Sequence, residues 1–349
     1  MSILSVSTIT DASGGNTATI NSYTPTESNM AGRNLIINGA MQVSQRGDSF
    51  TNVVSQHTLD RWKVYRNGTA EYTVTRSSDA PDGFANSLRL DCSTADGTVD
   101  AGDYTIIQYN IEGLDLQLLN YGRASALTKT LSFWVKSNVT GIVTVSSEIN
   151  TGPPFLSQDF TIYAADTWEY KTLTYVGNTT TAIDNDNSCG IELQMWLNAG
   201  SNFKGVAYNS STWQSTSADR VNPGNINISG STSNYFQITG VQLEAGSVAT
   251  PFERRQYGQE LALCRRYYAG GDGYMTLHPL AADGSGGYYR SQVYFDTPMR
   301  AAPTVSLVSS VNIDGTQAIT TNKVGFYADG KANNAYCYSN DGFTRSAEL

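Results

Sequence analysis

The sequence predicts an all-β protein whose main domain is a β-sandwich. Charged residues make up only 15% of the 349 residues, against about 25% in an average soluble protein. Ser, Thr, Asn, Gly and 21 Tyr supply most of the remaining polar surface. Thr and Tyr favour strands, whereas Asn and Gly favour tight turns. Many short strands separated by such turn residues are typical of a sandwich.

Two segments show the alternation of a half-buried strand most clearly. In TLSFWVKS (130–137) and GIELQMWLN (190–198), every second residue is apolar, so the apolar side chains share one face. Further strands are predicted over 105–111, 141–149, 158–164, 168–176 and 235–246. We therefore expect the sandwich to occupy residues 33–250, beginning with a buried strand in NLIINGAMQV (34–43) that runs into a turn at Arg46-Gly47-Asp48.

The segments on either side of the sandwich have different compositions. Residues 1–32 are rich in Ser, Thr, Asn and Gly and bury too little apolar surface to fold alone. We expect them to form an attachment or oligomerisation arm. A helical connector is predicted over 251–269, with Thr250 as N-cap and Pro251 in its first turn. Gly258 limits the firm part of this helix to 259–268. Residues 270–349 contain short strands, enough for a small C-terminal β domain.

Charge and cysteine usage exclude several classes of protein. A net charge of -9 disfavours nucleic-acid binding, which needs a basic face. No apolar run approaches the roughly 20 residues that span a bilayer, and the first residues do not resemble a secretory signal. The four cysteines form no CxxC pair, and there are only two histidines. We expect free thiols, no local zinc site, and synthesis in a reducing cytoplasm.

Candidate glycan-binding residues lie on the polar faces of two predicted strands, which we expect to form one shared surface. Trp134 and Lys136 belong to the first strand, and Glu192, Gln194 and Trp196 to the second. An aromatic ring can stack on a sugar while polar neighbours bond to its hydroxyls. The alternative is that another part of the chain, or another subunit, covers this face.

The cluster DNDN (184–187) offers Asp184 and Asp186, whose oxygens are of the kind that Ca²⁺ prefers. An acidic loop tip is the alternative, because a shell of about 6–8 ligands needs more oxygens than this stretch supplies. No other cofactor is predicted. The chain lacks GxSxG, HExxH and P-loop motifs, and two carboxylates alone offer at most a glycoside hydrolase site. We therefore predict that the protein is not an enzyme.

Several blocks resemble tail-fibre and related virion structural proteins of tailed bacteriophages of the marine and cyanobacterial type. They are GRNLIINGAMQVSQRG, LDRW, LSFWVKS, YFQITGVQLEAGSVATPFERRQYGQELALCRRYY and MRAAPTV. The resemblance covers nearly the whole chain, and the block ending in LCRRYY is its most specific part. It implies a jelly roll similar to carbohydrate-binding modules over 33–250, and a homotrimer. Those modules often carry a calcium-binding carboxylate after the Asn-Gly pair, but Ala40 and Met41 stand there in this sequence.

The residues and the resemblance together predict a non-enzymatic virion protein, a tail fibre or similar appendage that contacts host-surface glycans. It would be assembled in the bacterial cytoplasm and would bind other virion proteins through its arm. One alternative is a head-decoration or collar/adaptor protein with a purely assembly role. The other is a polysaccharide depolymerase, which is disfavoured because the long parallel β-helix repeats common in such enzymes are absent.

Overall fold

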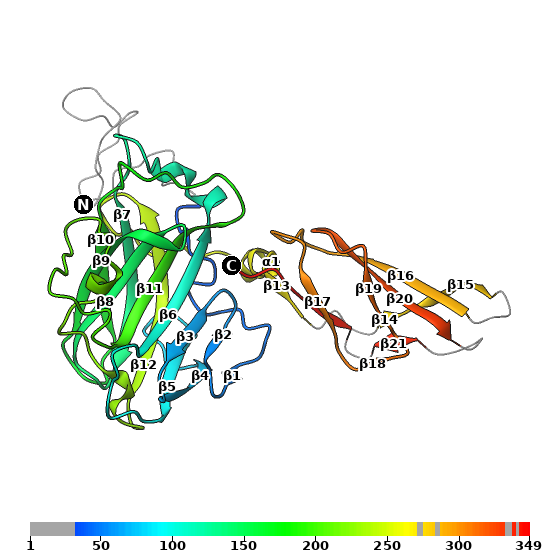
Figure 1. Cartoon of the computed structure of the whole chain (residues 1–349), viewed down its shortest axis with the longest axis horizontal. Coiled ribbons are helices and arrows are strands. Elements are labelled where there is room, and N and C mark those ends of the chain that lie inside the picture. The colour runs from blue at the N-terminus through cyan, green and yellow to red at the C-terminus, as the bar shows by residue number, and fades with distance from the viewer. Residues whose placement is uncertain (1–31, 271–274, 283–286, 332–336, 340–341) are drawn as a thin grey trace, which may run out of the picture.

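The computed structural model describes residues 32–270, 275–282, 287–331, 337–339 and 342–349. It shows an all-β protein in which a jelly-roll sandwich is followed by a short helix and a slender β domain (Figure 1). The predicted fold class is therefore confirmed. The predicted arm, residues 1–32, lies outside the described residues except for Gly32. Among the described residues, no helix is long and apolar enough to cross a membrane.

Two six-stranded antiparallel sheets form the sandwich, and we name each after its long central strand. The β12 sheet contains, in spatial order, β1 (Ser49–Phe50), β4 (Glu71–Ser77), β5 (Ser87–Thr94), β12 (Tyr235–Ala245), β7 (Lys129–Ser137) and β10 (Glu169–Tyr175). The β11 sheet contains β2 (Ser55–His57), β3 (Lys63–Asn67), β6 (Tyr104–Glu112), β11 (Cys189–Ala199), β8 (Gly141–Ile149) and β9 (Gly152–Ile162). Three 3₁₀ helices lie in the connections: η1 (Gly113–Leu119), η2 (Ser217–Asp219) and η3 (Ile228–Gly230).

Alternating apolar residues pack the two sheets together, as the sequence predicts. The apolar side chains of β7 and β11 belong to one buried cluster, and Phe133, Val135, Ile191 and Leu197 have no exposed surface. Side chains at alternate positions of a strand point to opposite faces. The polar residues of β7 and β11 therefore lie on the two outer faces of the sandwich, one on each sheet.

The predicted strand over 34–43 is wrong, although its apolar residues are buried as expected. The segment forms turns, and Asn38 and Met41 adopt positive φ angles of 60° and 55°. Its apolar side chains serve two different cores: Ile36 and Met41 pack in the sandwich, whereas Ile37 and Val43 pack against the helix region. A strand could not divide them in this way, because its two faces simply alternate.

Side chains satisfy the buried backbone of this irregular segment. The Asn38 carboxamide donates to the carbonyls of Val43 at 2.8 Å and Asp60 at 2.9 Å, and accepts from the Val43 amide at 2.9 Å. The Asn34 carboxamide bridges the segment to β12 by accepting from the Leu243 amide at 3.1 Å. A buried backbone group without such a partner costs free energy comparable to a lost hydrogen bond. The two asparagines therefore replace a β-ladder.

Residues that follow β12 complete the same network. Glu253 accepts from the amides of Gly32 and Asn34 at 2.8 and 2.7 Å, and Glu260 accepts from the amide of Asn38. Arg255 donates to the carbonyls of Asn34 and Ile36. The two blocks that carry most of the sequence resemblance are therefore in direct contact.

The predicted helical connector over 251–269 is shorter in the structure. Helix α1 spans Tyr257–Arg265, and Gly258 lies within it. Thr250 is not an N-cap, because its amide and its hydroxyl both donate to the Glu244 carboxylate, at 2.8 and 2.6 Å. Tertiary hydrogen bonds hold residues 250–256 in a non-helical conformation and override the local helix signal.

The described residues of the C-terminal region form short antiparallel strands in three small sheets. These are β13-β22-β17, β14-β21-β18 and β15-β16-β20-β19. Their bounds are β13 (Tyr268–Ala269), β14 (Met275–Thr276), β15 (His278–Ala282), β16 (Gly287–Tyr294), β17 (Thr304–Leu307), β18 (Ser310–Val311), β19 (Gly315–Gln317), β20 (Lys323–Lys331), β21 (Tyr338–Ser339) and β22 (Phe343–Ser346). Val324, Phe326 and Phe343 are the centre of its core. The four cysteines are free thiols.

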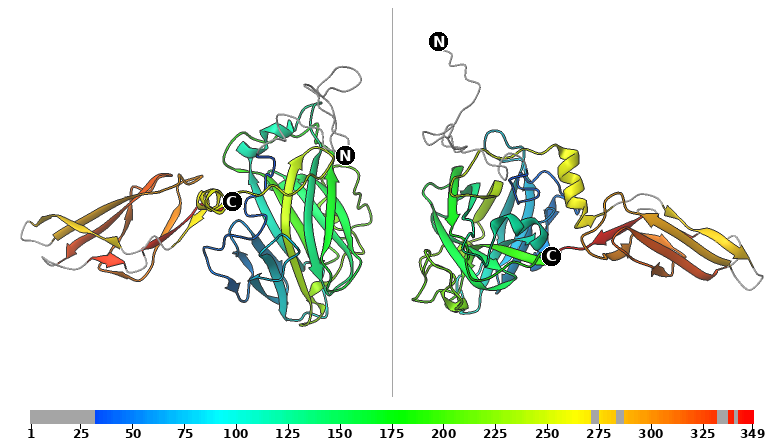
Figure 2. Two further views of the ribbon diagram at one scale, coloured as in Figure 1. Left: turned by 180° about the vertical axis from the view of Figure 1, so that it is seen from behind. Right: turned by 90° about the horizontal axis from the view of Figure 1, so that it is seen from above.

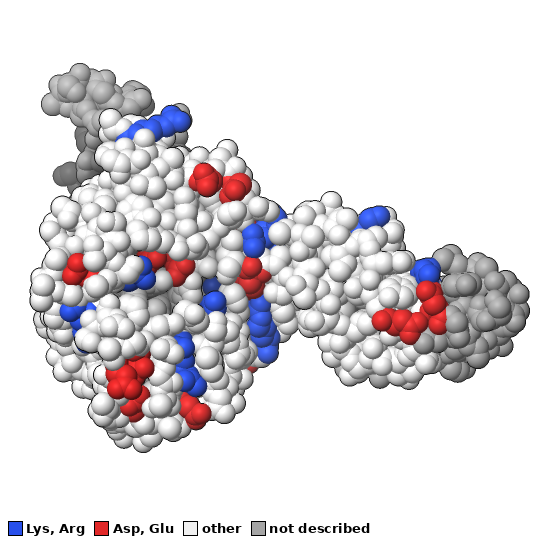
Figure 3. All heavy atoms as spheres, viewed as in Figure 1, with Lys and Arg blue, Asp and Glu red and all other residues white. Residues whose placement is uncertain are grey.

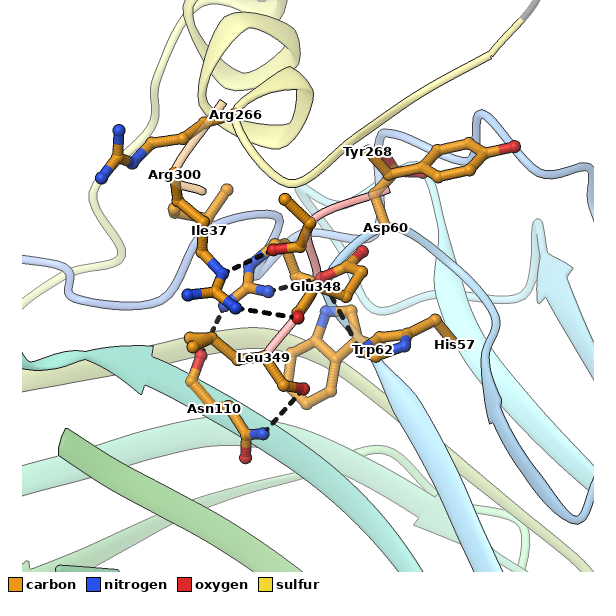
Figure 4. A network of polar contacts seen from close by, with 12 residues as sticks. Ile37, His57, Asp60, Trp62, Asn110, Arg266, Tyr268, Arg300, Glu348 and Leu349 are labelled. Atoms are coloured by element: carbon orange, nitrogen blue, oxygen red, sulfur yellow. Dashed lines mark hydrogen bonds and ion pairs between the residues drawn. The ribbon is translucent and has the colours of Figure 1, made fainter. Parts of the chain in front are cut away.

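The last residues return to the sandwich and join it to the C-terminal domain (Figures 2 and 4). Glu348 is ion-paired with Arg61 at 2.6 Å and with Arg46 at 2.9 Å, and Arg61 is itself stacked 3.4 Å from the ring centroid of Tyr267. Arg300 donates to the carbonyl of Glu348 at 3.1 Å and thereby holds the C-terminal residues against the sandwich. The Arg-Gly-Asp turn thus contributes Arg46 to an internal joint.

The joint should make the stability of the protein depend on pH. Burial alone would raise the pKa of Glu348, but the charges of Arg61 and Arg46 outweigh burial and hold that pKa below its usual value of 4.5. A carboxyl whose pKa is lowered on folding stabilises the fold above its unfolded pKa, and this contribution is lost as pH falls through the folded pKa. Burial lowers the pKa of His57 to about 4, so His57 is neutral at pH 7.

We expect Glu348→Gln to lower the free energy of unfolding at pH 7 by about 3 kcal/mol, because Arg61 keeps a buried charge without its partner. The difference from the natural protein should shrink as pH falls below about 4.5. Denaturant unfolding between pH 7 and pH 3 measures it, with the exposed Asp184→Asn as control. A difference that is the same at every pH would contradict this role of Glu348.

Candidate functional site

The five predicted glycan-binding residues do not share one face. Trp134 and Lys136 lie on β7 in the β12 sheet, whereas Glu192, Gln194 and Trp196 lie on β11 in the β11 sheet. The apolar residues of both strands point into the common core. Their polar faces therefore point in opposite directions, and the prediction of one shared site is wrong. The structure has two separate candidate surfaces.

Trp196 is buried, with 1% of its surface exposed. Residues 200–231 fold over this part of the β11 sheet, and Phe203 and Val221 pack against the Trp196 ring. Asn225 anchors the covering segment by donating to the Trp196 carbonyl at 3.1 Å and accepting from the Thr144 amide at 2.8 Å. Trp196 therefore has a structural role, which corresponds to the alternative interpretation that another part of the chain covers it.

Beside the covered region, four amide and carboxylate side chains form a polar floor on β6 and β11. Gln108, Asn110, Glu192 and Gln194 keep 7–8% of their surface exposed, and the two strands pair Gln194 with Gln108 and Glu192 with Asn110. Figure 3, which views the molecule from the side of this sheet, shows the face hollowed between the covering segment and the C-terminal domain. We call this surface the amide cleft. Gln108 and Asn110 were not among the predicted residues, although their spacing of two in TIIQYNI places them on one face.

Some polar atoms of the floor are hydrogen-bonded to each other, and others have no hydrogen-bond partner among the described residues. Gln194 donates to Oε1 of Glu192, and Gln108 donates to the Asn110 side chain at 3.2 Å. Oε1 of Gln108 and Oε2 of Glu192 accept no hydrogen bond within the part of the chain that the structure describes. Such oxygens can accept from sugar hydroxyls.

Two tyrosines lie near the floor on β3 and β6. Tyr65 is 38% exposed, and its ring centroid lies 5.4 Å from that of Tyr104. The Lys63 ammonium lies 5.1 Å from the Tyr65 ring centroid, and Lys63 pairs with Gln108 across the two strands. The amide cleft therefore combines an exposed aromatic ring, a cation and hydrogen-bonding amides.

A second carboxylate, Glu148 on β8, pairs directly with Glu192 across the sheet. Burial raises the pKa of Glu148 to about 7, although the nearby Arg220 opposes this shift. Glu148 is ion-paired with Arg220 at 2.9 Å and its side chain is 3% exposed. This pair fixes the covering segment, and the burial of Glu148 leaves little surface through which it could reach a substrate.

The outer face of the β12 sheet carries the second surface, a depression of about 360 Å³. Trp134 and Tyr170 pair across β7 and β10, with ring centroids 5.4 Å apart. Phe84 and Phe252 form a second aromatic pair with centroids 5.2 Å apart. We call this surface the aromatic depression; Arg254 and Gly240 also line it. Lys136 takes part in a separate ion pair with Asp79 at 2.8 Å.

Gly240 is required in the floor of the aromatic depression. It interrupts the pairing of β12 with β7 and has a φ angle of +62°, a conformation that favours glycine. A Cβ atom at this position would lie 2.7 Å from Cζ of Phe84 and 3.2 Å from Cδ1 of Trp134. The missing side chain therefore lets the two aromatic walls approach the sheet.

Asp184 and Asp186 are exposed, and their loop does not gather further acidic ligands. Both Asp186 oxygens accept from Ser188, at 2.8 Å from its amide and 3.3 Å from its hydroxyl. No group of three or more His, Cys, Asp or Glu side chains placed to hold a metal occurs in the described ranges. This donor set does not fit the oxygen shell that Ca²⁺ requires, and calcium binding stays an untested prediction.

The sandwich is similar to several solved structures, each at low sequence identity. The enzymatically active domain of tailspike protein 4 of bacteriophage CBA120 aligns with 61% of this chain at 15% identity and a TM-score of 0.33. The matched part is only 21% of that chain, about a fifth of its length. TmCBM61 in complex with β-1,4-galactotriose matches over 61% of this chain and 99% of its own, at 11% identity and a TM-score of 0.31.

The family 11 carbohydrate-binding module of the Clostridium thermocellum cellulase Lic26A-Cel5E aligns with 58% of this chain and 98% of its own, at 14% identity and a TM-score of 0.29. No family model matches the sequence, and no curated protein matches it. Structural similarities of this size carry no argument about function.

Truncation of the two tryptophans should lower the stability of the fold by different amounts. Trp196→Ala removes a fully buried ring and should lower the free energy of unfolding by about 3–5 kcal/mol. Trp134→Ala, on a half-buried surface, should lower it by about 1 kcal/mol. Denaturant unfolding compares the two. Equal losses would contradict the distinction between a structural and a surface tryptophan.

Proposed function

We propose that the protein is a non-enzymatic structural component of a tailed-phage virion, a tail fibre or similar appendage, that binds host-surface glycan in the amide cleft. The virion role is supported by the sequence blocks described above. The glycan role is supported by one observation: Gln108, Asn110, Glu192 and Gln194 form a polar floor beside the exposed ring of Tyr65. Neutral sugars bind proteins through this combination of hydrogen bonds and ring contacts.

The burial of Glu148 in an ion pair with Arg220 supports binding without hydrolysis in the amide cleft. General acid–base catalysis needs two groups within hydrogen-bond reach of the scissile bond. Glu192 lies in the cleft, but its cross-strand neighbour Glu148 is held by Arg220. A depolymerase would have to release Glu148 from this ion pair. We therefore favour binding over cleavage.

The head-decoration and collar alternatives predict a different use of the same sheet, because an assembly protein would bury the cleft against a neighbour. Tyr65 and Lys63 would then contact protein, and isolated particles would not bind free glycan. Localisation in the virion, with assembly in the bacterial cytoplasm, belongs to the proposal in either case.

The first test is glycan binding by the full chain. An array of bacterial surface polysaccharides identifies a ligand, and isothermal titration with that polysaccharide measures affinity. Gln108→Ala and Tyr65→Ala should each weaken binding by about tenfold, because each removes one hydrogen bond or ring contact. Tyr294→Ala, which removes an exposed tyrosine of the C-terminal domain, should bind normally.

Two results would overturn the proposal. Unchanged binding by both cleft variants would exclude the amide cleft as the site. Release of reducing ends from the bound polysaccharide would show that the protein is an enzyme, and Glu148→Gln and Glu192→Gln would then be examined.

We also propose that residues 1–32 attach the protein to the particle or join copies into a homo-oligomer, most simply a trimer. The arm sequence has scattered apolar residues and few charges, so copies can pair without strong repulsion. Deleting residues 1–32 should leave the melting temperature of the sandwich nearly unchanged but reduce association or attachment to the particle. Light scattering of both proteins measures association, and a full-length protein that stays monomeric at high concentration and in the particle would contradict the oligomer.

A further inference from the structure

Arg254, on the rim of the aromatic depression, is held in place by aromatic rings. Its guanidinium carbon lies 4.8 Å from the ring centroid of Phe84 and 5.8 Å from that of Phe252. It makes no ion pair and donates no hydrogen bond within the described part of the chain. Two basic side chains of the β12 sheet do have acidic partners. Arg89 is ion-paired with Asp91 at 2.7 Å, and Lys136 is ion-paired with Asp79 at 2.8 Å.

A stacked guanidinium without an acidic partner is suited to an anionic ligand. Arginine offers five N–H donors in a planar fork that matches a carboxylate. Stacking on two rings restricts the side chain without using those in-plane donors. None of the residues that line the depression is acidic. The one formal charge of the site is therefore positive, in a protein of net charge -9.

The rest of the depression favours a flat, partly apolar ring. Trp134 is half buried and Tyr170 is 46% exposed, and together they form an open aromatic wall. The volume of about 360 Å³ lies within the range of roughly 300–1,000 Å³ of small-ligand sites. Aromatic walls bind the C–H face of a pyranose ring, whose hydroxyls point outward to water.

We infer that the aromatic depression binds an acidic sugar, a hexuronate ring stacked on Trp134 and Tyr170 with its carboxylate bonded to Arg254. The site is on the opposite sheet from the amide cleft, so the inference does not rest on the proposed function. Two sites on one chain that bind the same polysaccharide would also raise its avidity without any new contact.

The experiment compares two ligands that differ only in charge. The probes are a glucuronate-containing oligosaccharide and its carboxyl-reduced, neutral counterpart, each titrated into the full chain by calorimetry. The natural protein should bind the uronate form roughly 10- to 100-fold more tightly, the effect of one bidentate charge-assisted contact. This preference should decrease as salt is raised.

Variants separate the charge contact from ring stacking. Arg254→Gln should bind both oligosaccharides equally weakly, because the carboxylate loses its partner. Trp134→Ala should weaken both ligands by a similar factor and leave their ratio unchanged. Arg123→Gln removes the same charge from an exposed site away from the depression and should behave like the natural protein.

Three outcomes would overturn the inference. The first is equal affinity of the natural protein for the neutral and the uronate oligosaccharide, and the second is an Arg254→Gln variant that keeps the preference. A glutamate-rich peptide that displaces the uronate oligosaccharide at equal concentration would show that the depression recognises acidic peptides instead.

Discussion

The buried backbone of residues 33–43 is the constraint on which the rest of the structure depends. This segment crosses two cores without forming a strand, so its polar groups need partners from elsewhere. Asn34 and Asn38 supply some from within, and Glu253, Arg255 and Glu260 supply the others. Gly39 shows how tightly the parts fit, because a Cβ there would lie 2.1 Å from the Val241 carbonyl oxygen.

The same hydrogen bonds position both the joint and the aromatic depression. Glu253 and Arg255 hold residues 250–256 against the sandwich, and this places the side chains of Phe252 and Arg254 in the lining of the aromatic depression. Glu260 fixes the first turn of α1. Arg266, which directly follows α1, then reaches the Glu112 carboxylate at 2.7 and 3.0 Å.

The two outer faces of the sandwich differ in whether other residues cover their aromatic side chains. On the β11 sheet, residues 200–231 cover Trp196, and the polar floor beside it stays partly open. On the β12 sheet, Trp134 and Tyr170 have no such cover from the described residues. A polar cleft and an aromatic depression therefore lie back to back, and they suit different parts of a polysaccharide.

The sequence alone determined the fold class, because a period of two in β6, β7, β8 and β11 places the apolar side chains on one face of each strand, the face that packs in the core of a sandwich. It also identified Glu192 and Gln194 as polar residues of an outer face. Only the tertiary structure decided which sheet each strand joined, and this separated Trp134 from Trp196. Alternation specifies a face but no neighbour, so neither the segment that covers Trp196 nor the contact of Arg254 with Phe84 could be predicted. Residues 34–43 formed turns for the same reason: their hydrogen-bond partners lie some 200 residues away in the chain.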